Sequence, residues 1–528
     1  MTRPGFVLEV DEKTPPLLVH EGEGFRLQKF PLGTRVIYPP DSLPAIKNVR
    51  GAIRRAIANP CDSEPLAELL KPGMKLTIAF DDLSLPLPTM KSPDIRQMIL
   101  EEVIELAARK GVEDLKLYAA NGLHRRMTAD ELEHAVGERV FRSFYPKDLT
   151  NHDGEDHDNL AYIGKTDKGE EVEINKRVAE SDLLVYANIN LTTMDGGHKS
   201  VPTGLMSYRS IKSHHNVHTL LHSKSVMDPR PGRSALHDSC ARMDKVLKDN
   251  GIRIFTIETT LDNEIFPAPF GFMNKREWEW SVKDQASYLA AKKAVDLAPS
   301  AVKHQVFMRI RSPYGVTGVN AGSTDAVHER TLAKLHEQQL TEVDGQSDIE
   351  VIGVPFIGPY DVNSIMNPIL VHCLGLGYLF NMYRNKPVVR PGGVVILFHP
   401  VPWEFHQVHH PSYVDFFEEV LSQTTDPSTI EAKWEEQYAT DPWYIHLYRK
   451  SYAYHGVHPF YMWYWGAQAL DHVGDVIVVG GDRKACARMG YRSASSFRDA
   501  LEMAGETVGR SPSISYLHLP PFTVADVR

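Results

Sequence analysis

The sequence is poor in cysteine and has no long hydrophobic segment, and both absences exclude classes of protein. Its four cysteines, at positions 61, 240, 373 and 486, are far apart, so there is no zinc-ribbon or CxxC spacing and no disulfide framework. No run reaches the ~18 apolar residues of a membrane span, and the N-terminus lacks the pattern of a secretory signal. We therefore expect a cytoplasmic protein that does not bind membranes.

Positive charge and the common nucleotide-binding motifs are also scarce. The 58 Lys and Arg residues are outnumbered by 68 Asp and Glu, which gives a formal net charge of −10. This balance does not favour a broad phosphate-binding surface, so we expect no nucleic-acid partner. The sequence contains no GxGxxG after a predicted strand, no P-loop, no GxSxG and no HExxH. A Rossmann dehydrogenase, a P-loop kinase, a serine hydrolase and a zincin are therefore unsupported.

The apolar pattern indicates the fold class. Short runs rich in β-branched residues alternate with helical patterns, which predicts an α/β fold with largely parallel sheets. The predicted strands are 76–80, 115–120, 183–189, 252–257, 349–354, 394–398 and 476–479. The clearest amphipathic helix is 94–109, where apolar residues recur at three- and four-residue spacing.

The chain of 528 residues is long enough for more than one domain. We expect two, residues 1–320 and residues 321–528, with the active site in the cleft between them. The junction is placed within 313–348, where regular structure is expected to be weakest because three glycines precede a polar stretch. In the second domain, aromatic residues crowd into 443–465. They predict either core and subunit contacts or a stacking wall for a flat ligand.

Polar loops follow two of the predicted strands, at the place where open α/β sheets bind ligands. Asp82 follows the strand 76–80, although an acidic pair there is also a common turn cap. His124 lies between the strand 115–120 and a capping-box pattern at 128–131. An imidazole that titrates near neutrality is a natural general base at such a position, and a surface histidine is the alternative.

A third loop, after the strand 183–189, holds the remaining candidates. The turn Gly196-Gly197 lets the backbone approach a ligand closely, and Lys199 follows it with a free amine. The pair His214-His215 comes shortly after, with His215 sixteen residues beyond the lysine. Imidazole binds nickel, copper and zinc, but a surface lysine and an ordinary histidine pair are the alternative readings.

Taken together, these loops resemble the nickel-dependent lactate racemase family of 2-hydroxyacid racemases and epimerases. Members have an Asp-x-Thr-Arg-Pro loop, a Gly-x-His-Arg loop, a Gly-Gly-Arg-Lys-Ser loop and a histidine sixteen residues beyond that lysine. The counterparts here are 82–86, 122–125, 196–200 and His215. The resemblance covers residues 20–480 and identifies the chain as a divergent member.

The resemblance implies a cofactor and the residues that hold it. The cofactor would be a nickel-pincer nucleotide, covalently linked to a lysine that matches Lys199, with nickel bound by His215. His124 matches one of the family's two catalytic histidines. The cofactor pocket would also include the following residues: Asp82, Gly196, Gly197, Trp465 and Gln468. Partners would be a small hydroxy acid and the accessory proteins that make the cofactor; a homo-oligomer is compatible with the sequence.

Two departures from the family pattern bear on the substrate. The arginine that holds the substrate carboxylate falls on Leu85, and the second catalytic histidine falls on Ile189. Neither side chain can form an ion pair or accept a proton. His198 or His218 could replace the second base, or one base could serve a bulky substrate.

We therefore expect an isomerase, a racemase or epimerase of a hydroxy acid larger than lactate, with a sugar acid as one candidate. The reaction would run by hydride transfer to and from the cofactor. The alternatives are a one-sided redox enzyme with the same cofactor and a non-catalytic protein that binds nickel or the cofactor.

Overall fold

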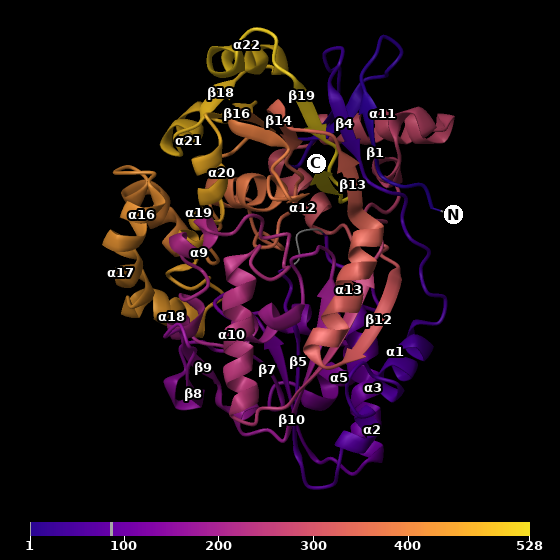
Figure 1. Ribbon diagram of the computed structural model, residues 1–528, viewed down its shortest axis with the longest axis vertical. Helices are drawn as coiled ribbons and strands as arrows, with labels where there is room; N and C mark the ends of the chain where they lie inside the picture. The colour runs from indigo at the N-terminus through magenta and orange to yellow at the C-terminus, as the bar shows by residue number, and fades with distance from the viewer. Residues whose placement is uncertain (1, 85–87) are drawn as a thin grey trace.

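The computed structural model describes residues 2–84 and 88–528, and most of its strands belong to two large sheets. Figure 1 shows one sheet in the lower half of the molecule, around β5 and β10, and the other in the upper half, around β14, β16 and β19. The predicted α/β class with largely parallel sheets is confirmed. Among the described residues, no helix is both long enough and apolar enough to cross a membrane.

The lower sheet has six strands in the order β12-β11-β10-β5-β6-β7. Their bounds are Lys75–Asp81 (β5), Asp114–Ala120 (β6), Leu149–Asn151 (β7), Leu183–Asn190 (β10), Ile254–Leu261 (β11) and Val316–Gly322 (β12). All neighbours are parallel except β12, which runs antiparallel to β11. In the register, Phe80 of β5 lies opposite both Ala119 of β6 and Ala187 of β10. The carboxyl ends of these three strands therefore meet at one edge of the sheet.

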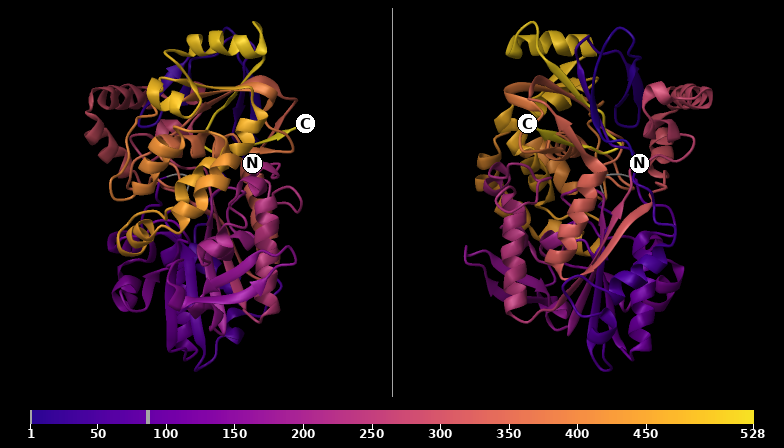
Figure 2. Two further views of the ribbon diagram at one scale, coloured as in Figure 1. Left: turned by 90° about the vertical axis from the view of Figure 1, so that its left-hand side faces the viewer. Right: turned by 45° about the vertical axis from the view of Figure 1, so that its right-hand side comes forward.

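The upper sheet has seven strands in the order β1-β4-β19-β14-β16-β17-β18. Their bounds are Phe6–Glu9 (β1), Arg35–Tyr38 (β4), Ser347–Gly353 (β14), Val389–Phe398 (β16), Asp475–Val479 (β17), Arg492–Ala494 (β18) and Ile514–Leu517 (β19). Strand β4 pairs with β19, so this sheet joins segments from both sides of residue 320. Figure 2 shows the indigo N-terminal strands beside the yellow C-terminal one. The division into 1–320 and 321–528 stays a prediction.

The predicted helix 94–109 is confirmed as α3 (Ile95–Arg109). Asp94 caps it by accepting a hydrogen bond from the Arg96 amide at 2.9 Å. The expected capping box is also present at the start of α4 (Ala129–Val136), where Thr128 and Glu131 bond each other's backbone amides. This cap fixes the point where the His124 loop turns into a helix.

The expectation that regular structure is weakest within 313–348 is wrong. The segment forms the edge strand β12, the helix α13 (Thr324–Gln339) and the strand β13 (Leu340–Val343). At Gly322 two backbones meet closely, because a Cβ atom there would lie 2.1 Å from the carbonyl oxygen of Cys61. Figure 1 shows α13 in front of the lower sheet, beside α10 (Ala235–Asp249).

Candidate active site

Loops at the carboxyl edge of the lower sheet and a helix from the C-terminal half line one pocket. The site pocket, as we call it, is lined by Ser84, Leu123, His124, Met194, Asp195, Lys199, Thr203, Ile211, His215, Pro359, Tyr360, Tyr378, His458, Tyr461, Met462 and Trp465. An adjoining inner pocket shares Ser84, His124, Asp195, Lys199 and Thr203 and adds Asp81, Asp82, Ala120, Tyr186, Ile189, Gly196, Ser200 and Gly204. The structure thus brings together His124, Lys199, His215 and Trp465, four of the residues singled out from the sequence.

His124 is held by Asp82. Its Nδ1 atom lies 2.9 Å from Oδ2 of Asp82, which is only 6% exposed. The same carboxylate accepts hydrogen bonds from the amide and the hydroxyl of Ser84, both at 3.0 Å. Burial alone would raise the pKa of Asp82, but His124 and the bonds from Ser84 hold that pKa below its ordinary value. An ionised Asp82 orients the imidazole and leaves its Nε2 for the pocket, as in other Asp–His pairs.

Asp82 lines the inner pocket together with Lys199, and its carboxylate pairs with His124 there. Whether it also touches the cofactor stays a prediction.

The Gly196-Gly197 turn holds Lys199 at the pocket. Both glycines adopt positive φ angles, +79° and +61°. A Cβ on Gly196 would lie 2.1 Å from Oδ1 of Asn190, and one on Gly197 would lie 2.7 Å from the ring of His328. The Gly197 amide donates to the buried carboxylate of Glu258 on β11 at 2.6 Å. The turn thus packs tightly against the sheet and fixes the 3₁₀ turn Gly197–Lys199.

The two adjacent histidines have different surroundings. His215 lines the site pocket, whereas His214 is fully buried beside it, with their Nδ1 atoms 2.7 Å apart. Burial, and then the charges that His214, His124 and Lys199 could carry, lower the pKa of His215 well below its ordinary value. His215 is therefore neutral, which is the form that binds metals.

The aromatic segment contributes both core and pocket wall. In α19 (His458–Trp465), Tyr461 and Trp465 line the site pocket, while Trp463 and Tyr464 are buried elsewhere in the core. The Trp465 ring stacks on Tyr378 at 5.3 Å and meets the His215 ring edge to face at 5.7 Å.

Three buried polar atoms on this wall have no hydrogen-bond partner among the described residues. They are Nε2 of His458, the hydroxyl of Tyr461 and Nε1 of Trp465. Their spacing along α19 puts them on one face of the helix, and all three residues line the site pocket. Buried polar groups are rarely left unpaired, so this face is suited to a polar ligand.

Gln468, like Gly197 in the turn before Lys199, is in the lining of neither pocket. Its amide donates to the backbone carbonyl of Lys224 and to the hydroxyl of Tyr383, both at 2.8 Å. Gln468 belongs to α20 (Ala467–His472), and these hydrogen bonds hold that helix against Lys224 and Tyr383. A contact with the cofactor stays a prediction.

The structure also locates the positions that depart from the family pattern. Leu85 lies outside the described residues. Ile189 is buried at the end of β10, where its amide donates to Oδ2 of Asp81 at 2.6 Å. Burial raises the pKa of Asp81 to about 7.

Neither of the two histidines suggested as a second base reaches the pocket. His198 is bound between the carboxylates of Asp244 and Asp325, both at 2.7 Å. His218 is exposed and packs its ring on His222 at 4.1 Å.

Sequence reasoning missed His458, Tyr360 and Tyr378, which line the pocket from the C-terminal half. One signal in the sequence could have identified His458. It lies seven residues before Trp465, and this spacing puts both side chains on one face of a helix.

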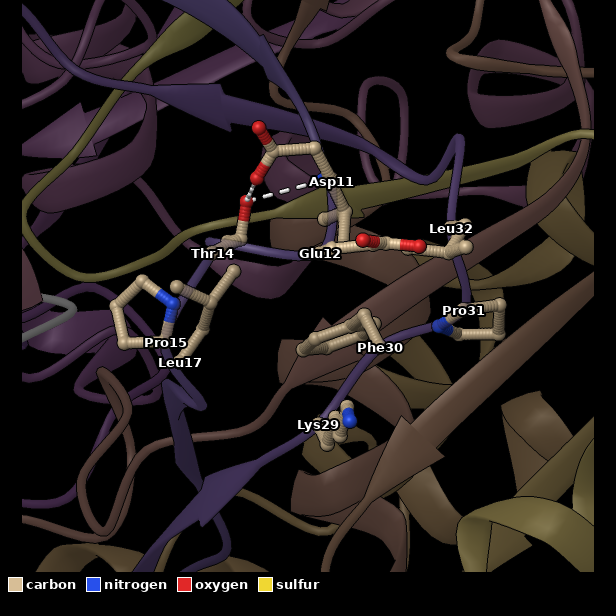
Figure 3. Close-up of a pocket in the computed structure, with 10 residues that line it drawn as sticks. Asp11, Glu12, Thr14, Pro15, Leu17, Lys29, Phe30, Pro31 and Leu32 are labelled. Atoms are coloured by element: carbon tan, nitrogen blue, oxygen red, sulfur yellow. Dashed lines mark hydrogen bonds between the residues drawn. The ribbon is translucent and has the colours of Figure 1, made fainter.

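The described residues offer no alternative metal cluster, and the pocket in Figure 3 lacks the candidate residues. No group of three or more His, Cys, Asp or Glu side chains there could hold a metal ion by itself. Figure 3 shows a different pocket, between 10–17 and 29–32, where Asp11 and Thr14 form two hydrogen bonds: the Thr14 hydroxyl donates to the Asp11 carboxylate at 2.8 Å and accepts from the Asp11 amide at 3.0 Å. It contains none of the candidate residues.

Comparisons with known proteins match mainly the N-terminal half of the chain. Residues 24–228 match the family described as the lactate racemase N-terminal domain. The lactate racemase of Lactiplantibacillus plantarum is 27% identical over 217 residues, 40% of this chain and 48% of its own. That of Thermoanaerobacterium thermosaccharolyticum is 26% identical over 167 residues, 31% of this chain and 37% of its own. The matches thus span half or less of these curated relatives.

A solved structure extends the likeness to the whole fold. The lactate racemase apoprotein from Thermoanaerobacterium thermosaccharolyticum superposes with a TM-score of 0.63 at 17% identity, covering 97% of this chain and 100% of that one. At this identity the likeness concerns the fold alone.

Proposed function

Because this chain is a divergent, lactate racemase-like family member, we propose that it is a racemase or epimerase of a 2-hydroxy acid that uses a nickel-pincer nucleotide. The observation that carries the proposal is the convergence of Lys199, His215 and the His124–Asp82 pair on one pocket. We place the active site there, in the cleft between the two expected domains.

The residues present fit such a cofactor. Lys199 lines both pockets and offers an amine for the covalent link, and His215 offers one neutral imidazole to the metal. One protein ligand suffices when the cofactor supplies the other donors, which agrees with the lack of a three-residue metal cluster in the described part of the chain. The aromatic rings of Trp465 and Tyr461 provide a wall for a flat ring.

When bound, the cofactor would accept the α-hydrogen of the substrate with its two electrons and return it. The protein contributes the proton chemistry: His124, held by Asp82, takes the hydroxyl proton through Nε2 as the carbonyl forms. The pocket holds the flat 2-oxo acid until the hydrogen returns to its other face. The accessory proteins that make the cofactor would be partners of this chain.

Replacing His215 by Ala should abolish nickel binding and leave the fold intact. The neutral imidazole at the pocket is the expected metal ligand, whereas His214 is turned into the core. Metal analysis of protein produced with the accessory proteins checks this, with circular dichroism as the measure of folding. His214→Ala is the matched control; if it loses nickel while His215→Ala keeps it, the assignment is wrong.

The pocket chemistry favours a substrate larger than lactate. Lys199 is the only Lys or Arg among the described lining residues, and it is committed to the cofactor, so a small carboxylate finds no ion-pair partner there. The unpaired groups of Tyr461 and Trp465 offer hydrogen bonds to further hydroxyls. A hydroxyl-rich acid, such as a sugar acid, can recover binding energy through these contacts.

Tyr461→Phe should lower kcat/KM for a sugar acid about three- to tenfold and leave lactate turnover unchanged. The substitution removes one hydrogen bond, worth about 0.5–1.5 kcal/mol, and keeps the ring. Chiral chromatography of a panel of D- and L-lactate and six-carbon sugar acids measures the inversion. Tyr464→Phe is the control, because the Tyr464 hydroxyl donates to Glu435 at 3.0 Å away from the pocket. Lactate as the best substrate of wild type would refute the larger-substrate proposal.

The same assay separates the alternatives when the substrate carries deuterium at C2. Deuterium retained in the inverted product supports a racemase or epimerase. Net accumulation of the 2-oxo acid would support a one-sided redox enzyme, and no turnover by nickel-loaded protein would support a binding protein.

A further inference from the structure

The proposed reaction needs an acid/base group for each epimer, because the two hydroxyls point to different sides of the reacting carbon. A racemase pairs two such groups, and Ile189 occupies the place where the resemblance puts the second. The site pocket contains one more histidine besides His124 and the expected metal ligand. It is His458, the first residue of α19, which is only 2% exposed.

His458 is held rigidly by its neighbours. Its Nδ1 atom and the hydroxyl of Tyr413 form a hydrogen bond of 2.6 Å. Its ring packs on Tyr454 and Tyr360, with centroids 4.4 and 4.9 Å away. When Nδ1 carries the ring proton and donates it to Tyr413, Nε2 keeps a lone pair. Nε2 is the buried atom without a partner.

The two pocket histidines lie close enough to serve one oxygen atom. The centroids of His124 and His458 are 5.4 Å apart, and their planes are nearly perpendicular at 84°. A hydroxyl oxygen that lies beside both rings, and not between them, can be within hydrogen-bond distance of each, about 2.6–3.2 Å. They come from different halves of the chain, His124 from a loop of the lower sheet and His458 from α19.

The electrostatic surroundings of the pair differ. Burial first, and then His124, His215, His410 and His455, lower the pKa of His458 well below its ordinary value, so it is a neutral proton acceptor. His124 instead lies with its Nδ1 atom 2.9 Å from the Asp82 carboxylate.

We propose that His458 is the second acid/base of the site, which rests on the proposed function. With one epimer, the hydroxyl O–H bond breaks and the proton passes to Nε2 of His458 as the carbonyl forms. The bound cofactor would take the α-hydrogen with its electron pair. When the hydrogen returns to the opposite face, protonated His124 gives its proton to the oxygen. The other epimer follows the reverse sequence, and solvent restores the starting protonation.

Asp81 is the rival proton carrier, but its geometry is less suitable. Its two carboxylate oxygens already accept hydrogen bonds, from the Ile189 amide at 2.6 Å and the Tyr186 hydroxyl at 3.3 Å. It lines the inner pocket and not the site pocket.

Single-turnover experiments on cofactor-loaded protein test the assignment. Each epimer of a pair (D- and L-lactate, or D-gluconate and D-mannonate) is mixed with enzyme, quenched with acid, and the 2-oxo acid is trapped as a hydrazone. Wild type should form it from both members of a pair. His458→Gln should form the 2-oxo acid at least a hundredfold more slowly from one epimer and at an unchanged rate from the other. His124→Gln should show the same defect with the opposite epimer. His406 lies outside the pocket lining, so His406→Gln is the control and should form the 2-oxo acid at the wild-type rate from both epimers.

Equal rates with both epimers in His458→Gln would overturn the proposal, and a one-epimer defect in Asp81→Asn would assign the role to Asp81. No 2-oxo acid from wild type with any probe would instead contradict the proposed function.

A second measurement does not depend on turnover. Diethyl pyrocarbonate modifies neutral imidazoles that it can reach, and peptide mass spectrometry locates the products. In apoprotein it should modify His458 through the pocket but not His214, which is equally buried and outside it. Modification of His124 without His458 would show that Nε2 of His458 does not face the pocket, and this would also overturn the proposal.

Discussion

Lys199→Ala protein produced together with the cofactor-making proteins should have the mass of its sequence alone, whereas wild type should carry the added mass of one nucleotide-derived cofactor. The positive-φ turn at Gly196-Gly197 leaves Lys199 at the junction of the two pockets. Since no other lysine lines either pocket among the described residues, no other amine can form the link there. Activity should be abolished as well.

Intact-protein and peptide mass spectrometry measure the increment and its position. Lys199→Arg should also lack it, because a guanidinium keeps the charge but does not replace the amine in the link. Lys212→Ala is the control, since Lys212 packs over the Tyr208 ring nearby and lies outside the pockets. An unmodified Lys199 in active, nickel-containing wild type would disprove the tether.

His124→Ala should lower turnover about 10²- to 10⁴-fold with the cofactor still bound. The loss should affect kcat and kcat/KM equally, because the interaction strengthens only as the proton moves. Asp82→Asn should lower both at least tenfold, since an amide neither stabilises the imidazolium nor fixes the tautomer in the same way.

Steady-state kinetics at matched nickel content check this pair of variants. His157→Ala is the control, because the His157 side chain is 77% exposed and is not part of the pocket lining. Additive losses in the double variant His124→Ala/Asp82→Asn would show that Asp82 does not act through His124. Turnover near that of wild type in His124→Ala would remove His124 from the mechanism.

Local sequence signals predicted much of the lower sheet and its loops. The helix α3, the capping box at Thr128 and the strands that lead to His124 and Lys199 depend on residues close together in the chain. The order of loops along the chain then located the pocket, because parallel strands deliver their carboxyl ends to one edge.

Contacts between distant residues were not predictable in the same way. The pairing of β4 with β19 links residues from opposite ends of the sequence, and no local pattern specifies it. His458 becomes recognisable only when α19 is packed against the pocket. Gln468 is the opposite case. It was expected at the pocket because it lies near Trp465 in the sequence, but its side chain donates to Tyr383 instead.

The position of β4 between β1 and β19 in the upper sheet has a consequence for how the protein is made. Its neighbour β19 is translated almost 500 residues later, which at roughly 5–20 residues per second takes about 25 to 100 seconds. Throughout that time the edge of β4 that will receive β19 is unpaired, and an open strand edge can recruit other chains. The upper sheet therefore cannot be completed during most of translation, and the yield of folded protein should depend on chaperones and on temperature during expression.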